Sequence, residues 1–192
     1  ALVEERTGNY LLFFPSYAYL EQVFLLFAAD RPGIETLVQT PSMTEAERED
    51  FLARFSAANS RTLVGFAVMG GIFGEGIDLT GERLSGAAVV GVGLPGISPE
   101  REVIRRYYDA ANGQGFQYAY RYPGINRVMQ AAGRVIRSSA DRGAVLLIDT
   151  RFSSHRYRSL FPGHWRPASV GSIRDLKRAL GAFWASTGEQ PG

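Results

Sequence analysis

The sequence Gln130-Ala131-Ala132-Gly133-Arg134-Val135-Ile136-Arg137 lies within a longer segment, residues 124–138, whose apolar side chains recur at the spacing of an α-helix. At 3.6 residues per turn, the polar side chains of this segment fall within a band of roughly 80° on the opposite side. These polar side chains are Arg127, Gln130, Arg134 and Arg137. The segment therefore predicts an amphipathic helix with one basic face.

Such a basic face does not favour helix stability by itself. Like charges three or four residues apart cost about 0.2–0.5 kcal/mol per pair, and no acidic residue lies between Gly124 and Ala140 to offset them. One interpretation is a solvated face. The other is an anion site, because guanidinium groups pair well with phosphate oxygens. Gly133 favours the anion site, since a glycine in the middle of a helix costs about 1 kcal/mol and marks a close approach.

The composition is that of one globular domain. The chain has 192 residues, is 45% hydrophobic and carries a net charge of only +2, so any binding of nucleic acid must depend on local patches. The absence of cysteine excludes disulfides and thiolate metal sites. No apolar run approaches the 18 or so residues of a membrane span and no secretory signal is visible, so we expect a cytoplasmic location. The start at Ala1 suggests an excised or processed portion of a larger protein.

Lysine usage limits the nucleotide chemistry of this chain. Lys177 is the single lysine among 21 basic residues, and no glycine-rich loop precedes it. A phosphate-binding P-loop needs Gly-Lys-Ser/Thr. The sequence also contains no Asp-Glu pair of the Walker-B type that holds a metal ion beside a bound nucleotide. If this chain takes part in nucleotide chemistry, the primary phosphate and metal ligands must therefore come from elsewhere, and we expect no metal site in the chain itself.

Apolar runs alternate with helical patterns along the chain, which predicts an α/β fold with a mostly parallel sheet. Strands are expected at residues 10–15, 34–39, 62–68, 86–92 and 144–148. Helices are expected after Ser16, from Thr44 to about residue 57, from about Pro99 to residue 108, at 124–138 and at 173–185 after Ser172. We expect one domain over residues 1–185, followed by a disordered polar tail at 186–192.

Three features on this scaffold are candidate binding sites. Ser16 caps a helix directly after a strand, where a helix N-terminus also favours anions. Residues 70–78 contain four glycines and two carboxylates, a composition typical of a flexible loop and also suited to close approach of a ligand. Residues 91–96 match the dinucleotide pattern G-x-G-x-x-G, but Pro95 and Pro99 disfavour the helix that must open on those glycines.

The segment after Pro99 interleaves arginines and aromatics, a pattern that suits single-stranded nucleic acid. We select Arg105, Arg106 and Tyr122 as candidate DNA contacts. The alternative is that these tyrosines pack on the domain surface. Asp149 and Arg151 follow the last expected strand, where α/β proteins place ligands, and they could equally form a local ion pair.

Gln130-x-x-Gly133-Arg134-x-x-Arg137 resembles motif VI of superfamily 2 helicases. The following residues 141–151, Asp-Arg-Gly-Ala-Val-Leu-Leu-Ile-Asp-Thr-Arg, narrow the resemblance to the C-terminal motor domain of the DinG/XPD-like DNA helicases. The resemblance runs from about residue 10 to about residue 165. It implies a RecA-like three-layer sandwich, the second of two such domains in an ATP-dependent helicase that unwinds DNA in the 5′→3′ direction.

The resemblance also implies roles for individual residues. Arg134 and Arg137 would close over an ATP–Mg complex held mainly by the N-terminal RecA-like domain, and Gln130 would orient the phosphate or its attacking water. Nucleotide-binding positions carried over from motifs V and VI are Glu75, Gly76, Asp78 and Gly133. Ser16, in the position of motif IV, would hold the DNA backbone. An iron–sulfur cluster, present in many relatives, would lie outside this chain, and the isolated chain is expected to be inactive.

Two other function classes stay open at this point. One is a non-catalytic module that binds nucleic acid through the arginine–aromatic segment. The other is a dinucleotide-binding enzyme built on Gly91, Gly93 and Gly96.

Overall fold

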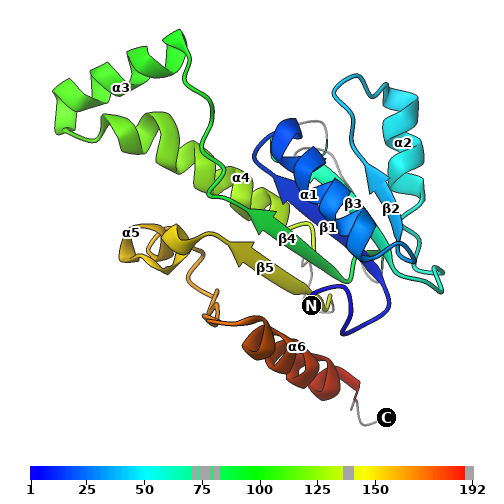
Figure 1. Cartoon of the computed structure of the whole chain (residues 1–192). Helices are drawn as coiled ribbons and strands as arrows, with labels where there is room; N and C mark the ends of the chain where they lie inside the picture. Colours follow the sequence, from blue (N-terminus) through cyan, green and yellow to red (C-terminus); the bar gives the residue numbers. More distant parts are fainter. Residues whose placement is uncertain (71–72, 74–78, 80–82, 136–140, 189–192) are drawn as a thin grey trace.

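A computed structural model of the chain describes residues 1–70, 73, 79, 83–135 and 141–188 (Figure 1). Its strands are β1 (Asn9–Phe14), β2 (Glu35–Val38), β3 (Leu63–Val68), β4 (Gly86–Val90) and β5 (Ala144–Ile148). Its α-helices are α1 (Tyr17–Asp30), α2 (Glu45–Ala53), α3 (Pro99–Asn112), α4 (Tyr122–Ala132), α5 (His155–Arg158) and α6 (Ile173–Gly188). A π-helix, η2 (Gln117–Arg121), runs directly into α4, and a 3₁₀ turn, η3 (Thr150–Ser153), follows β5.

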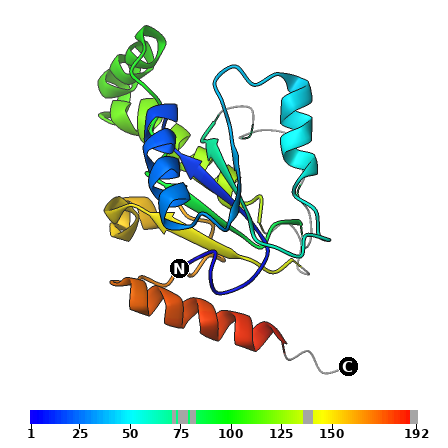
Figure 2. The ribbon, with the colours of Figure 1, turned by 45° about the vertical axis from the view of Figure 1, so that its right-hand side comes forward.

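The five strands form one sheet in the order β2-β3-β1-β4-β5, and every pair is parallel. β1 occupies the centre because its apolar run, Tyr10 to Phe14, can be buried from both faces. Successive side chains of a strand point to opposite faces. Leu11 and Phe13 join the core that α2 and α4 cover, and Tyr10 and Phe14 join the core that α1 and α6 cover. The predicted three-layer α/β architecture is therefore confirmed (Figures 1 and 2).

Helix caps were the most accurate local predictions. Thr44 and Glu47 form the expected capping box, in which the Thr44 hydroxyl accepts from the Glu47 N–H and the Glu47 carboxylate accepts from the Thr44 N–H. The Ser16 hydroxyl accepts from the Tyr19 N–H at 3.2 Å, and the Ser172 hydroxyl accepts from the Asp175 N–H at 3.1 Å. These bonds satisfy N–H groups that have no partner within the helix.

Several element boundaries differ from the prediction, including the ends of α2 at Ala53 and of α3 at Asn112. α4 ends at Ala132, so the helix predicted over residues 124–138 stops well before its expected end. The segment before it is a π-helix, which periodicity did not indicate. α6 continues through Gly188 and so includes residues 186–188 of the predicted tail.

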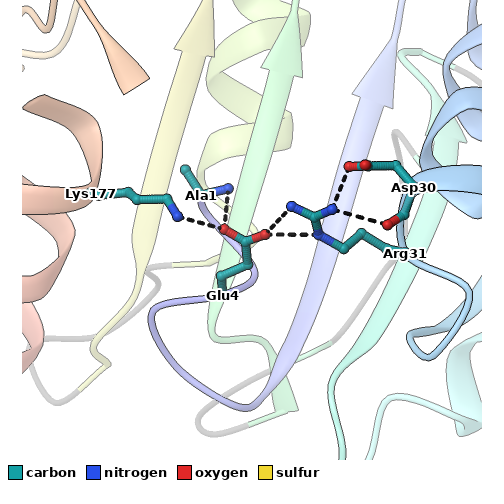
Figure 3. A network of polar contacts seen from close by, with 5 residues as sticks. All are labelled: Ala1, Glu4, Asp30, Arg31 and Lys177. Carbon is teal, nitrogen blue, oxygen red and sulfur yellow. Dashed lines mark hydrogen bonds and ion pairs between the residues drawn. The ribbon is translucent and has the colours of Figure 1, made fainter. Parts of the chain in front are cut away.

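Glu4 ties the N-terminal segment to the two helices that share one face of the sheet (Figure 3). Its carboxylate accepts from Arg31 Nε at 2.8 Å at the end of α1, and it lies 3.1 Å from Nζ of Lys177 on α6. The amino group of Ala1 also lies 3.1 Å from this carboxylate. These contacts, the hydrogen bond from Arg31 foremost, lower the pKa of Glu4 to about 2. Within the described part of the chain, no helix is both long and apolar enough to span a bilayer.

Candidate functional site

The carboxyl ends of β1 and β3 bring two of the predicted features to one edge of the sheet. Phe14 is in register with Val68, and the Met69 N–H donates to the Phe14 carbonyl at 2.9 Å. Ser16 and Gly70 each follow this pair by two residues. Parallel α/β sheets bind ligands beyond the carboxyl ends of their strands. The strand register therefore places the Ser16 cap beside the start of the glycine-rich loop.

Gln39 fixes this edge, and the sequence analysis did not identify it. Its side chain is almost completely buried, at 2% exposure. Its Nε2 donates to the Tyr17 hydroxyl at 2.8 Å, and its Oε1 accepts from the Val68 N–H at 2.8 Å. One amide thus joins the ends of β2 and β3 to the first residue of α1. The sequence offers only a weak signal for Gln39, which is a polar residue at the end of a short apolar run.

Ser16 serves as an N-cap, as one of the two interpretations predicted. Its side chain is exposed, and its hydroxyl oxygen accepts from Tyr19, so the O–H remains able to donate to an anion outside the helix. The cap role and a phosphate contact are therefore compatible at the same side chain.

Two apolar residues that flank the predicted ligand-binding residues of the glycine-rich segment are buried in the core. Phe73 is fully buried, with its ring centroid 4.5 Å from that of Phe51, and Leu79 is 1% exposed. Burial of these two apolar side chains holds residues 73 and 79 in the core of the domain. Glu75, Gly76 and Asp78 lie outside the described residues.

The end of α4 carries the residues of the arginine motif. Gln130 is exposed on the last turn, Gly133 is the C-cap, and Arg134 is half-buried in the turn that follows. The Gly133 N–H donates to the Met129 carbonyl at 2.8 Å, with φ at −67°, which any residue can adopt. Val135, at 2% exposure, anchors the turn in the core.

This geometry corrects the argument from Gly133, because the glycine ends the helix instead of interrupting it. A Cβ at Gly133 would lie 3.1 Å from the Met129 carbonyl oxygen, so its tight contact is with its own helix. The predicted stripe is also shorter than expected, since Arg127 and Gln130 alone lie on α4, and Arg134 follows it. Arg137 lies outside the described residues.

The dinucleotide pattern has a packing function. The next helix, α3, begins at Pro99 and not on the glycines of residues 91–96. Gly93 has φ +67°, and a Cβ there would lie 2.6 Å from the carbonyl oxygen of Gly124 on α4. A Cβ at Gly124 would in turn lie 2.7 Å from the Val92 carbonyl oxygen. These glycines let the loop after β4 pack directly against α4, and they hold no helix N-terminus toward a dinucleotide.

The arginine–aromatic segment forms an arm of α3, η2 and the start of α4 that extends from the body of the domain (Figure 1). Tyr108 stacks on Tyr118 with centroids 3.9 Å apart, and Tyr118 meets Tyr122 edge-on at 5.2 Å. Tyr107 meets Tyr108 edge-on at the outer end of this column and is 65% exposed. The packing interpretation is thus confirmed for Tyr122, which is half-buried against Tyr118.

The two predicted arginines of the arm differ in their surroundings. Arg105 forms an ion pair with Glu102 at 2.9 Å. Arg106 is exposed and makes no hydrogen bond or ion pair with the rest of the described chain. Arg106 is therefore the more available of these two arginines for binding a phosphate group.

Asp149 and Arg151 form the local ion pair that was one of two expectations. Nη2 of Arg151 lies 2.7 Å from Oδ2 of Asp149, and Nε lies 2.9 Å from Oδ1. This bidentate bond keeps the pKa of Asp149 below its usual value. Among the residues that the structure covers, no group of three or more acidic, histidine or cysteine side chains could hold a metal ion.

An all-parallel five-stranded sheet with helices on both faces and loops converging at the carboxyl edge defines a RecA-like α/β domain. The helicase C-terminal domain family matches residues 1–168. The chain belongs to this family, which confirms the resemblance read from the arginine motif.

Named relatives agree with this assignment. The chain is 31% identical over 174 residues to regulator of telomere elongation helicase 1 of Bos taurus, covering 82% of this chain and 14% of that protein. It is 30% identical over 156 residues to the ATP-dependent DNA helicase XPD of Sulfolobus acidocaldarius, covering 78% of this chain and 26% of that protein. It is 26% identical over 179 residues to the 3′-5′ exonuclease DinG of Bacillus subtilis, covering 91% of this chain and 18% of that protein.

Solved structures show the same fold. An apo XPD structure matches with a TM-score of 0.62 at 22% identity, covering 79% of this chain and 30% of that one. An XPD helicase structure matches with a TM-score of 0.61 at 23% identity, covering 82% of this chain and 28% of that one. The chain thus spans less than a third of the length of each of these relatives and solved chains.

Proposed function

We propose that this chain, over residues 1–185, is the second RecA-like domain of an ATP-dependent DNA helicase and completes an ATP site that it shares with an N-terminal RecA-like domain. The observation that carries the proposal is the strand register that sets Ser16 beside Gly70 at the carboxyl edge. The names of the relatives, an ATP-dependent DNA helicase among them, support it.

The residues of this chain are suited to make additional contacts to ATP and Mg²⁺, and not to supply their primary ligands. The single lysine, Lys177, is paired with Glu4 on the far layer, and the described residues offer no metal cluster. The primary phosphate and metal ligands would therefore come from the N-terminal domain. When bound there, ATP supplies the phosphoryl group and Mg²⁺ neutralises part of its charge. A cytoplasmic location, and an iron–sulfur cluster outside this chain if one is present, belong to the same proposal.

Arginines of this domain would contact the transferring phosphoryl group. Arg134 and Arg137 follow the end of α4, and Gln130 is exposed on its last turn, available to orient the phosphate or its attacking water. An arginine contributed across a domain interface is worth roughly 10³–10⁵ in rate. The backbone at Gly133 and the loop residues Glu75, Gly76 and Asp78 would complete the nucleotide contact.

Single-stranded DNA would follow the exposed polar groups of the same edge and of the arm. Ser16 presents a hydroxyl and a helix N-terminus, which suit a backbone phosphate. Arg106 and Arg105 supply positive charge on α3, and Tyr122 stabilises the tyrosine column from the start of α4. The exposed ring of Tyr107 adds a surface on which a base could stack.

The test is DNA-stimulated ATP hydrolysis by the full-length protein. Arg137→Ala should nearly abolish it while the circular dichroism spectrum stays unchanged. A reduction of less than about threefold, equivalent to roughly 0.7 kcal/mol, would remove Arg137 from the proposed role. The 192-residue chain alone should not hydrolyse ATP, and hydrolysis by it would contradict the shared site.

A second candidate function is a non-catalytic module that binds nucleic acid. The exposure of Arg106 and Tyr107 on the arm favours it. Tight, salt-dependent binding of single strands by a full-length protein that does not hydrolyse ATP would support this alternative over the motor.

A further inference from the structure

Arg127 has surroundings that the proposed roles do not explain. It lies on α4 one turn before Gln130 and is partly buried. Its guanidinium makes no hydrogen bond or ion pair with any of the described residues, although it carries five N–H donors. Withdrawing a charged group from water without a partner is unfavourable. The position therefore fits a side chain whose partner is a ligand.

Gly70 provides the space that this arginine occupies. A Cβ at Gly70 would lie 2.8 Å from Nε of Arg127 and 3.1 Å from its Cδ and Cζ atoms. Gly70 also has φ +70°, which favours glycine. The guanidinium of Arg127 is thus held against the backbone just beyond β3, at the edge where parallel sheets bind ligands.

We propose that Arg127 is an additional phosphate-binding residue, seated against Gly70, which connects α4 to the carboxyl end of β3 through a bound phosphate oxygen. A guanidinium suits such an oxygen because it offers a planar, permanently charged set of donors. The proposal rests on the proposed function, in which the phosphate belongs either to the DNA backbone or to the nucleotide. The two sources share one chemistry and are separated by the experiment.

The main variant is Arg127→Met in the full-length protein, because methionine retains an unbranched apolar stem and removes the charge. The matched control is Arg174→Met on α6, which removes an exposed arginine that forms no bond with the described residues and lies in the opposite layer. Binding of a dT₂₀ oligonucleotide is measured by fluorescence anisotropy at several KCl concentrations. Binding of a fluorescent ATP analogue and ATP hydrolysis are measured in parallel.

If the phosphate is that of DNA, Arg127→Met should weaken dT₂₀ binding about tenfold and reduce the slope of log K against log [KCl] by about 0.7, with analogue binding unchanged. If it is that of the nucleotide, analogue binding should weaken about tenfold with the DNA slope unchanged. Arg127→Lys should keep the charge and hence most of the salt slope. Arg174→Met should match the wild type in both assays.

Unchanged binding of both ligands by a folded Arg127→Met variant would overturn the proposal. If that variant fails to fold, Arg127→Lys decides. In that variant, a loss of binding of about threefold or more, with the wild-type unfolding midpoint, supports the proposal, and wild-type affinity for both ligands overturns it. A wild type that binds DNA and the analogue but does not hydrolyse ATP refutes the motor and leaves Arg127 to be judged by binding. A wild type that binds neither ligand overturns both.

Discussion

Gly93→Ala tests whether the glycines after β4 exist for packing, and the structure gives its magnitude. The new methyl group would lie 2.6 Å from the carbonyl oxygen of Gly124, well inside the 3.4 Å at which ordinary contact begins. The loop and α4 must therefore separate by most of an ångström, and overpacking of this kind costs about 1–3 kcal/mol. Holding alanine at φ +67° adds about 1–2 kcal/mol. We expect a total loss of about 2–5 kcal/mol.

The neighbouring glycines are matched controls for this prediction. Gly91 has φ +82° but no neighbour closer than 4.0 Å, so Gly91→Ala should cost only the backbone strain of about 1–2 kcal/mol. Gly96 has nothing within 4 Å and no positive φ, so Gly96→Ala should lie within about 0.5 kcal/mol of the wild type. The free energies of unfolding come from urea titrations of the chain followed by tryptophan fluorescence. Equal losses for Gly93→Ala and Gly96→Ala, or a loss below about 1 kcal/mol for Gly93→Ala, would refute the packing argument.

Three further predictions address the anchors and the arginine motif. Phe73→Ala should lower the free energy of unfolding by about 3–5 kcal/mol, because the ring is fully buried against Phe51. A change of less than about 1 kcal/mol in the same urea titration would show that Phe73 does not anchor this segment in the core. Glu4 has a pKa of about 2 in the folded chain, below its unfolded value, so its contribution is present above about pH 5 and is lost as the pH falls toward 2. Glu4→Gln should cost about 1 kcal/mol or less at pH 7 because the partners are partly exposed, and should flatten the loss of thermal stability between pH 5 and pH 3. In the full-length protein, Arg134→Lys should lower kcat for DNA-stimulated ATP hydrolysis at least about tenfold with little change in DNA affinity, whereas a proportional loss of both would indicate a folding defect.

The sheet was predictable because most of its strands carry an apolar run, the edge strand β2 (Glu-Thr-Leu-Val) being the exception. Burial on both faces selects such runs for the interior of a parallel sheet, as the Tyr10–Phe14 run of β1 illustrates. The caps were predictable because a single hydroxyl beside a helical pattern satisfies N–H groups locally, as Ser16 does. These features depend on neighbours in sequence, which periodicity and residue type describe directly.

Contacts between distant segments were not predictable by the same means. The meeting of Gly93 with Gly124, and of Arg127 with Gly70, depends on where a loop crosses a helix, which no local pattern encodes. The end of α4 was missed for a related reason, because apolar spacing continues through Val135 although the helix stops at Ala132. Val135 is buried as a helical residue would be, but it reaches the core from a turn.

The distribution of charge is the strongest physical reason to regard this domain as one half of a site. Twenty of its 21 basic residues are arginines, and its single lysine, Lys177, is used in the Glu4 network on the layer opposite α4. The planar guanidinium of an arginine can donate two parallel hydrogen bonds to the oxygens of one phosphate group, whereas a P-loop surrounds the phosphate with backbone N–H groups and a lysine. An edge that offers Arg127 and a serine cap, without a lysine loop, is suited to approach a phosphate group that another domain already holds. Closing the two domains over that group would then move the arm together with the sheet, because the Gly93–Gly124 contact fixes the loop after β4 to the start of α4, which belongs to the arm.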